Sequence, residues 1–167
     1  MALRFVSVLA ALLLLAACET STDATGGAGG SGGASGSGSG ISAPRPGTAE
    51  DFVVNVGDRV FFDFDKYSLK PDARNILQRQ ATWLNKFPSV TITVEGHCDE
   101  RGTREYNLAL GERRANSAKN YLVALGVNPN RIKTLSYGKE RPAVTGSNEA
   151  AWSQNRRSVT VVSGAAS

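Results

Sequence analysis

The stretch Val94-Glu95-Gly96-His97-Cys98-Asp99-Glu100-Arg101-Gly102 decides how this chain folds. Apolar and polar residues alternate from Val90 into this stretch, which predicts a strand with one buried face. Two glycines then bracket an acidic turn, and a helix is predicted to follow over about residues 103–125. The carboxylate of Asp99 is therefore expected at a corner where a strand passes into a helix.

Similar patterns on both sides of this stretch predict further strands and helices. A strand over residues 60–64 and a helix that starts near Ser68 and ends at Pro88 come before it, and strands follow over residues 132–137 and 158–162. A short helix is expected over residues 149–154. This βαβαβ(α)β order predicts an α+β domain whose helices pack on one face of a mixed four-stranded sheet.

The composition divides the chain into four parts. Residues 1–17 are typical of a signal peptide, because their apolar run is shorter than the roughly 20 residues that span a membrane. Residues 18–50 contain a stretch of almost pure Gly, Ser and Ala, which has nothing to bury and is expected to be a disordered linker. Residues 51–163 are expected to form one compact domain, and residues 164–167 a short tail.

The end of the predicted signal peptide, Leu15-Ala16-Ala17-Cys18, resembles the lipobox of bacterial lipoproteins. That resemblance implies cleavage before Cys18 and attachment of lipid to its sulfur, and several acyl chains together anchor a protein stably to a membrane. Glu19 stands where an Asp would favour retention at the inner membrane, so the outer membrane is expected. The alternative is an ordinary secretory signal in which Cys18 is incidental.

Charge and the reactive side chains argue against several classes of protein. The chain has 19 Lys and Arg against 15 Asp and Glu, without the clustered basic face that nucleic-acid binding needs. If Cys18 carries lipid, Cys98 has no partner and no disulfide framework is expected. His97 and Cys98 are adjacent on an extended strand and point to opposite faces, so the imidazole is badly placed to activate the thiol. Contiguous residues rarely close a metal shell, so we predict neither an enzyme nor a metal or cofactor site.

Arg114 interrupts the apolar face of the second long helix. It stands four residues after Leu110 and four before Ala118, and this spacing places all three on one side of a helix. A buried guanidinium needs partners, and the nearest acidic candidates are Asp99 and Glu95. Two interpretations remain open at this point. Arg114 and Asp99 form an ion pair that only locks the corner, or they offer a donor and an acceptor to a ligand that carries both a carboxylate and an ammonium.

The motif around the corner resembles a known family. Residues 96–107, continued by Leu110-Gly111-Glu112-Arg113-Arg114-Ala115, look like the peptidoglycan-binding motif of OmpA-like domains. Residues 60–67, 136–142 and 155–157 match the family pattern as well. The resemblance implies binding of the peptidoglycan stem peptide at meso-diaminopimelate, whose free end is a zwitterion. It implies Asp99 and Arg114, rather than Arg113, as the main ligand-binding residues, with Asp65, Tyr67 and Asn107 lining the pocket and Arg157 supporting it.

Together with the lipobox, the motif is most similar to the lipid-anchored members of the family. This implies an outer-membrane lipoprotein whose periplasmic domain holds peptidoglycan and works with the Tol proteins, through TolB, in envelope constriction at cell division. Charged residues near the turn, including Glu100, Arg101 and Arg113, are interpreted as a solvated rim that also suits a protein partner. The alternatives are an OmpA-like anchor without Tol partners and, less favoured, an enzyme acting on the cell wall.

Two further expectations concern packing. The aromatic residues are assigned to the core rather than to the site, among them Phe52, Phe61, Trp83, Phe87 and Trp152. Cys98 departs from the family, because many OmpA-like domains have Thr there. A thiol at this position behaves as a small apolar group and does not replace a hydroxyl hydrogen bond.

Overall fold

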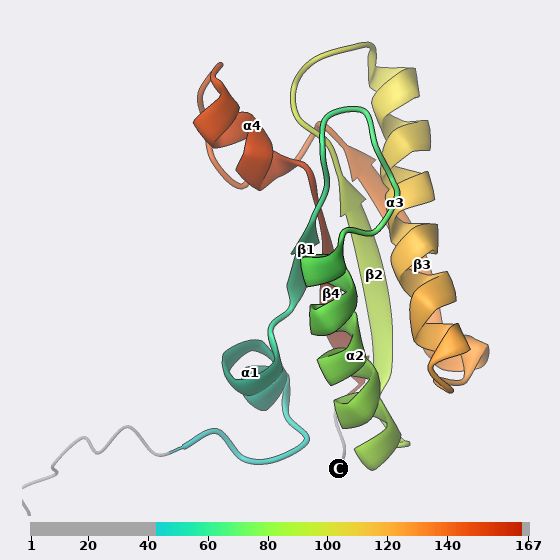
Figure 1. Cartoon of the computed structure of the whole chain (residues 1–167). Helices are drawn as coiled ribbons and strands as arrows, with labels where there is room; N and C mark the ends of the chain where they lie inside the picture. Colours follow the sequence, from blue (N-terminus) through green and yellow to red (C-terminus); the bar gives the residue numbers. More distant parts are fainter. Residues whose placement is uncertain (1–42, 165–167) are drawn as a thin grey trace, which may run out of the picture. The chain divides into compact units, whose positions relative to one another are not determined.

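The computed structural model describes residues 43–164 (Figure 1). The predicted signal peptide, Cys18 and the Gly-rich linker lie outside the described residues, as do residues 165–167. None of the described helices combines the length and apolar character that crossing a membrane requires.

The domain is built on a four-stranded sheet with the strand order β1-β4-β2-β3. The strands are β1 (Arg59–Phe61), β2 (Thr91–His97), β3 (Ile132–Gly138) and β4 (Arg157–Gly164). β2 pairs with β3 in parallel, whereas β4 lies antiparallel to both β1 and β2. The predicted mixed four-stranded sheet and the α+β class are therefore confirmed.

Two long helices cover one face of the sheet, as Figure 1 shows. The helix α2 (Pro71–Lys86) begins later than the predicted start at Ser68, because Lys70 is extended and the proline occupies the first helical position. The helix α3 (Arg104–Ala124) begins where the sequence predicts. Thr103 caps its start, because the Thr103 hydroxyl accepts a hydrogen bond from the backbone N–H of Tyr106. The short α4 (Glu149–Asn155) is also present as predicted.

The sequence did not predict three short helical segments. They are α1 (Ala49–Asp51), the π-helical turn η1 (Phe52–Val56) and the 3-10 turn η2 (Pro129–Arg131). Each is too short to show a hydrophobic period. Thr48 caps α1, so regular structure begins ahead of the predicted boundary at residue 51.

An aromatic cluster fills the core between η1 and α2. The ring centroids of Phe52 and Trp83 lie 4.9 Å apart, and those of Trp83 and Phe87 lie 4.8 Å apart. Phe52 is fully buried and Trp83 nearly so, as expected for core residues. The carboxylate of Asp51 accepts a hydrogen bond from the Trp83 indole N–H at 2.8 Å, which ties α1 to this cluster.

α3 lies directly on β2 at a contact between two glycines. A Cβ atom placed on Gly96 would stand 1.8 Å from the carbonyl oxygen of Gly111. Only residues without a side chain allow the two backbones to approach so closely. This contact sets the distance between the carboxyl end of β2 and the first half of α3, where the predicted site residues lie.

Candidate functional site

A cavity of about 180 Å³ opens where β2 ends and α3 begins. Asp99 and Arg114 both line it, and so do Asp65 and Asn107. Tyr67 does not: it is exposed and lines a separate groove with Tyr121. The structure thus brings together four of the predicted ligand-binding residues and places the fifth elsewhere. The other lining residues are Phe64, Cys98, Arg101, Gly102, Tyr106 and Leu110.

Arg114 is fully buried, at 0% exposure, yet it forms no ion pair within the described part of the chain. Its guanidinium donates instead to three backbone carbonyls, those of Lys66 at 2.8 Å, His97 at 2.7 Å and Asp63 at 3.2 Å. The structural ion pair that the sequence left open is therefore not formed. An arginine has five N–H groups, so two remain outside these bonds on a side chain that lines the cavity.

Burial acts on the charge of Arg114 as well. Removal from water lowers the pKa of this guanidinium, and the positive charge of Arg156 acts in the same direction. A guanidinium nevertheless stays protonated at neutral pH. The cavity therefore contains a desolvated cation whose attraction for an incoming anion is screened less than it would be in water.

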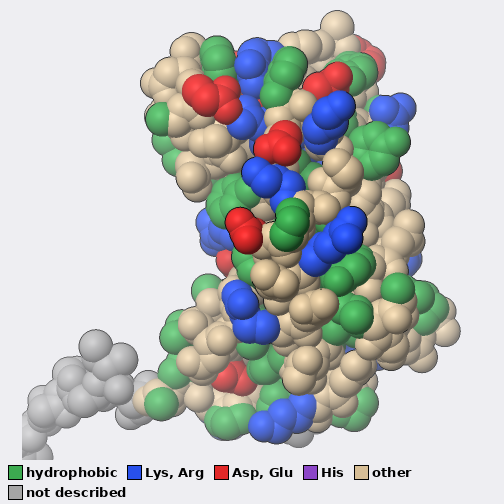
Figure 2. All heavy atoms as spheres, viewed as in Figure 1, with side chains coloured by type: hydrophobic (Ala, Val, Ile, Leu, Met, Phe, Trp, Pro, Cys, Tyr) green, Lys and Arg blue, Asp and Glu red, His purple; other side chains and the backbone are tan. Residues whose placement is uncertain are grey.

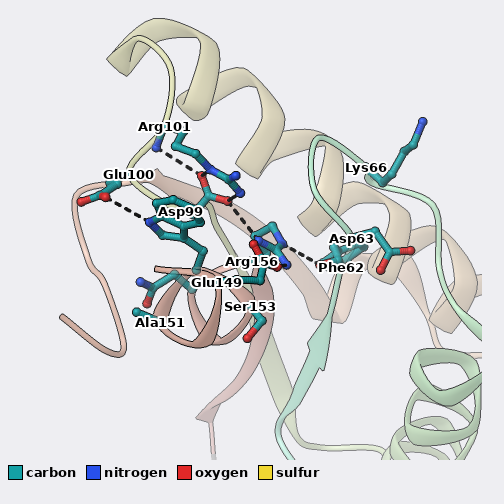
Figure 3. A network of polar contacts seen from close by, with 12 residues as sticks. Phe62, Asp63, Lys66, Asp99, Glu100, Arg101, Glu149, Ala151, Ser153 and Arg156 are labelled. Atoms are coloured by element: carbon teal, nitrogen blue, oxygen red, sulfur yellow. Dashed lines mark hydrogen bonds and ion pairs between the residues drawn. The ribbon is translucent and has the colours of Figure 1, made fainter. Parts of the chain in front are cut away.

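Asp99 is also buried, at 4% exposure, and four hydrogen bonds reach its carboxylate (Figure 3). Arg101 donates three of them, from its backbone N–H at 3.2 Å, its Nε at 3.2 Å and its Nη2 at 2.6 Å. Arg156 donates the fourth from Nη1 at 3.3 Å. Burial alone would raise the pKa of Asp99, but these hydrogen bonds outweigh it and hold the pKa below its ordinary value. The site thus presents a carboxylate that is ionised at neutral pH.

Arg101 is held by two aromatic rings in addition to Asp99. Its guanidinium carbon lies 4.0 Å from the ring centroid of Phe64 and 4.0 Å from that of Trp152. The indole N–H of Trp152 donates to the side chain of Glu100 at 3.0 Å. Two expectations therefore need correction, because Trp152 is a half-buried residue at the site rather than core, and Arg101 belongs to the site rather than to a solvated rim.

Arg156 is the second cation that the sequence analysis did not assign to the site. It is nearly buried and also donates to the carbonyl of Phe62 at 3.1 Å and to the carboxylate of Glu149. Its neighbour Arg157, the predicted support, donates instead to the carbonyls of Asn155 and Arg141 and does not line the cavity. The sequence carried no local signal for this, because Arg156 lies in the bend between α4 and β4 and belongs to neither element.

Asp65 and Asn107 shape the walls of the cavity. Asp65 has a positive φ of 56°, and its carboxylate accepts a hydrogen bond from the Tyr106 hydroxyl. The side-chain amide of Asn107 donates to the carbonyls of Arg101 at 2.8 Å and Thr103 at 3.0 Å. Asn107 therefore braces the turn that carries Asp99 and Arg101.

His97 and Cys98 lie on different sides of the sheet end, as their adjacent positions predicted. Cys98 lines the cavity and donates from Sγ to the carbonyl of Asn107 at 3.3 Å. Burial raises the pKa of its thiol to about 11, so the thiolate that acts as a nucleophile is scarce at neutral pH. His97 stacks on Tyr137 with ring centroids 5.4 Å apart. Burial, together with the positive charges of Arg157 and Arg141, lowers the pKa of His97 to about 4.

Comparison with protein families identifies the class. The model of the OmpA family matches residues 61–156, which include both the cavity and the glycine contact. The chain therefore belongs to the OmpA family.

The individual relatives are more specific. The chain is 58% identical over 130 residues to the peptidoglycan-associated lipoprotein of Rhizobium meliloti, covering 78% of this chain and 74% of that protein. It is 57% identical over 129 residues to the protein of the same name from Mesorhizobium japonicum, covering 77% of each chain. These matches confirm the resemblance to the lipid-anchored members of the family.

Solved structures agree with this assignment. The crystal structure of the peptidoglycan-associated lipoprotein from Burkholderia pseudomallei aligns with a TM-score of 0.62 at 44% identity, over 63% of this chain and 89% of that one. The C-terminal domain of MotB from Helicobacter pylori aligns with a TM-score of 0.60 at 26% identity, over 64% of this chain and 84% of that one. The fold is therefore shared with a protein of a different name.

Proposed function

We propose that the cavity binds the free amino-acid end of meso-diaminopimelate in the peptidoglycan stem peptide. The observation that carries this proposal is that Asp99 and Arg114 line one cavity without pairing with each other. A ligand with an ammonium and a carboxylate on one carbon complements both groups at once. The names of the relatives, which associate those proteins with peptidoglycan, support the same ligand class.

Each half of the ligand has a chemically suited partner. The two remaining N–H groups of Arg114 suit a carboxylate, which arginine binds in a planar fork. The ionised carboxylate of Asp99 suits an ammonium. Asp65 adds a second acceptor on the cavity wall, and Leu110 and Phe64 offer apolar surface to the aliphatic chain between the two ends of diaminopimelate.

At the level of the cell, the proposed role is anchoring without chemistry. The domain would bind the cell wall non-covalently while lipid on Cys18 fixes the chain to the outer membrane, facing the periplasm. The similarity to relatives named as lipoproteins supports this arrangement. The high thiol pKa of Cys98 supports a binding role over an enzyme that uses this cysteine.

A protein partner is proposed on the same surface. Figure 2 shows charged side chains of both signs over the end of the domain that carries α4 and the start of α3. Such a surface suits a polar interface, and we assign it to TolB, with action in the Tol system during cell division. The alternative is an OmpA-like anchor without Tol partners, which the structural similarity to a domain of MotB favours. Capture of purified TolB, and its competition with soluble peptidoglycan fragments, separates the two.

The test of the ligand is sedimentation of the purified domain with peptidoglycan sacculi. Asp99→Ala and Arg114→Lys are each expected to lose most of the bound fraction, the latter because lysine keeps the charge without the planar fork. Arg113→Ala, which removes an exposed arginine next to Arg114, is the matched control and should bind as wild type does. Full binding by both site variants would contradict the proposal, provided that their thermal unfolding shows an intact fold.

A further inference from the structure

The hydrogen bonds of Asp99 leave no vacancy for a ligand. A carboxylate offers about four lone pairs, two on each oxygen. Oδ1 accepts from the backbone N–H and the Nε of Arg101, and Oδ2 accepts from Nη2 of Arg101 and Nη1 of Arg156. An ammonium that binds Asp99 must therefore replace at least one of these donors.

The two arginines differ in how firmly they are fixed. The Arg156 side chain is only 6% exposed and has two further partners, the carbonyl of Phe62 and the carboxylate of Glu149. The Arg101 side chain is 31% exposed, and its guanidinium has no hydrogen-bond acceptor other than Asp99 among the described residues. The displaceable donor is therefore the side chain of Arg101.

The aromatic rings complete the arrangement. Phe64 and Trp152 each contact the Arg101 guanidinium at 4.0 Å, and such stacking stabilises an arginine at a partly exposed site. Phe64 and Arg101 both line the cavity. Arg101 thus lies at the cavity wall, where it neutralises the carboxylate that the ligand needs.

We infer that the Arg101 side chain competes with the ligand for the ammonium subsite at Asp99. Arg101 occupies this subsite in the free domain until the ammonium of a ligand displaces its side chain from Asp99. This inference rests on the proposed function. The carboxylate subsite at Arg114 keeps two N–H groups outside its internal bonds. The two halves of the site therefore differ. The buried guanidinium of Arg114 keeps two N–H groups outside its bonds to the described residues, whereas every lone pair of the Asp99 carboxylate is occupied. Arg101 sets the affinity for ligands that carry an ammonium and leaves binding through the carboxylate unaffected.

The test uses two synthetic tripeptides with an acetylated N-terminus, L-Ala-γ-D-Glu-meso-diaminopimelate and its counterpart with 2-aminopimelate, which keeps the distal carboxylate but lacks the ammonium on the same carbon. Calorimetry compares wild type with Arg101→Ala, Arg101→Lys and Arg104→Ala. Arg104 is an exposed arginine at the start of α3 whose contact is Glu140, so its removal matches the change in net charge. The backbone bonds of residue 101 to Asp99 and Asn107 survive the alanine substitution.

Arg101→Ala is expected to bind the diaminopimelate tripeptide about two- to fivefold more tightly than wild type, the range that corresponds to loss of one partly exposed ion pair. Arg104→Ala should stay near the wild-type affinity, and Arg101→Lys should show a smaller gain than Arg101→Ala, because lysine keeps the charge but loses the fork and the stacking. The aminopimelate tripeptide should show no gain with Arg101→Ala. Weaker or unchanged binding of the diaminopimelate tripeptide by Arg101→Ala overturns the inference, as does an equal gain for both tripeptides.

Fluorescence gives a second, direct readout. The chain has two tryptophans, and Trp83 is buried in the core away from the cavity. Release of the Arg101 guanidinium from Trp152 should change the emission on binding in wild type and not in Arg101→Ala. An identical change in both variants would overturn the displacement. If wild type binds neither tripeptide, the proposed function fails, whereas wild-type binding without a gain in Arg101→Ala defeats only the inference.

Discussion

Two carboxylates lie buried in this domain, and they are built for different purposes. Asp51 accepts hydrogen bonds from the backbone N–H of Gly47 at 2.9 Å, the Asn55 amide at 2.8 Å and the Trp83 indole at 2.8 Å. All three donors are uncharged and belong to the packing around α1 and α2. Asp99 is held by two arginines, one of them partly exposed, and it lines a cavity.

The difference shows that burial and a full set of hydrogen bonds do not by themselves mark a binding residue. The pKa of both carboxyls is lowered, for Asp51 first by Asn55 and Trp83, and for Asp99 by arginines that overcome its burial. What separates them is their surroundings. Asp99 lines a cavity, and Arg101, which donates three of its four hydrogen bonds, can swing its side chain into solvent. At Asp51 the exposed Asn55 can also turn away, but the Trp83 indole and the Gly47 backbone are buried and stay in place, and Asp51 does not line the cavity.

The largest expected effect comes from Gly96→Ala, which disrupts the close contact between β2 and α3 next to the cavity that Asp99 lines. The added methyl group collides with the backbone of α3 at Gly111, and rigid backbone cannot move aside cheaply. We expect a loss of more than about 3 kcal/mol in the free energy of unfolding, together with loss of peptidoglycan binding. Chemical denaturation measures the first effect and sedimentation with sacculi the second. A variant of wild-type stability would show that the contact between α3 and β2 is not needed.

Substitution of Asp51 and of Asp99 by alanine tests the comparison between the two carboxylates. Asp51→Ala leaves the indole N–H of Trp83 and the backbone N–H of Gly47 buried without an acceptor, and should cost about 2–3 kcal/mol of stability while binding is retained. Asp99→Ala should cost about 1 kcal/mol or less, because Arg101 can turn to solvent and Arg156 keeps Glu149, while binding is lost. Chemical denaturation measures the stability of both variants, and sedimentation with sacculi measures their binding. A larger stability loss in Asp99→Ala, or a loss of binding in Asp51→Ala alone, would refute the distinction between the two carboxylates.

The smallest effect concerns a third buried titratable group, His97. Among residues 43–164, neither ring nitrogen of His97 has a hydrogen-bond partner, and Nε2 lies 3.6 Å from the Glu95 carboxylate. Its pKa is about 4 in the folded protein against 6.5 ordinarily, so the unfolded chain binds the proton more tightly. Stability should be complete above pH 6.5 and decline as pH falls toward 4, by roughly 1–2 kcal/mol between pH 7 and 5.

His97→Phe is the control for this pH dependence, because phenylalanine can stack on Tyr137 without titrating. The chain has one histidine, and the lowered pKa values of Asp51 and Asp99 place their own losses below pH 3.8. Denaturation midpoints of the phenylalanine variant should therefore be flat between pH 7 and 5. A slope equal to that of wild type would assign the effect to other groups.

Local sequence patterns were enough to predict the positions of Asp99 and Arg114 in the candidate site. The spacing of Leu110, Arg114 and Ala118 placed the arginine on the sheet-facing side of α3, and the glycine-bracketed turn placed Asp99 at the end of β2. Both follow from the geometry of single elements, which the sequence displays directly.

The rest of the site depends on where distant segments meet. Arg156 reaches Asp99 across 57 positions of sequence, and the Trp152 ring stacks on Arg101 only because α4 returns to the turn. The expected position of Tyr67 at the cavity differs from the observed one for the same reason. The loop after β1 offers the backbone carbonyls of Asp63 and Lys66 to Arg114 and turns the tyrosine outward. No period or spacing within a short window contains this information.

The three carbonyls around Arg114 have a consequence for the order in which the protein matures. They come from segments 17, 48 and 51 residues away along the chain, so they exist together only once these distant segments have come together. A partly assembled chain has no oriented guanidinium to offer. On the proposed function, attachment to the wall therefore reports that the polypeptide has finished folding, and an immature copy would diffuse past its target without being retained.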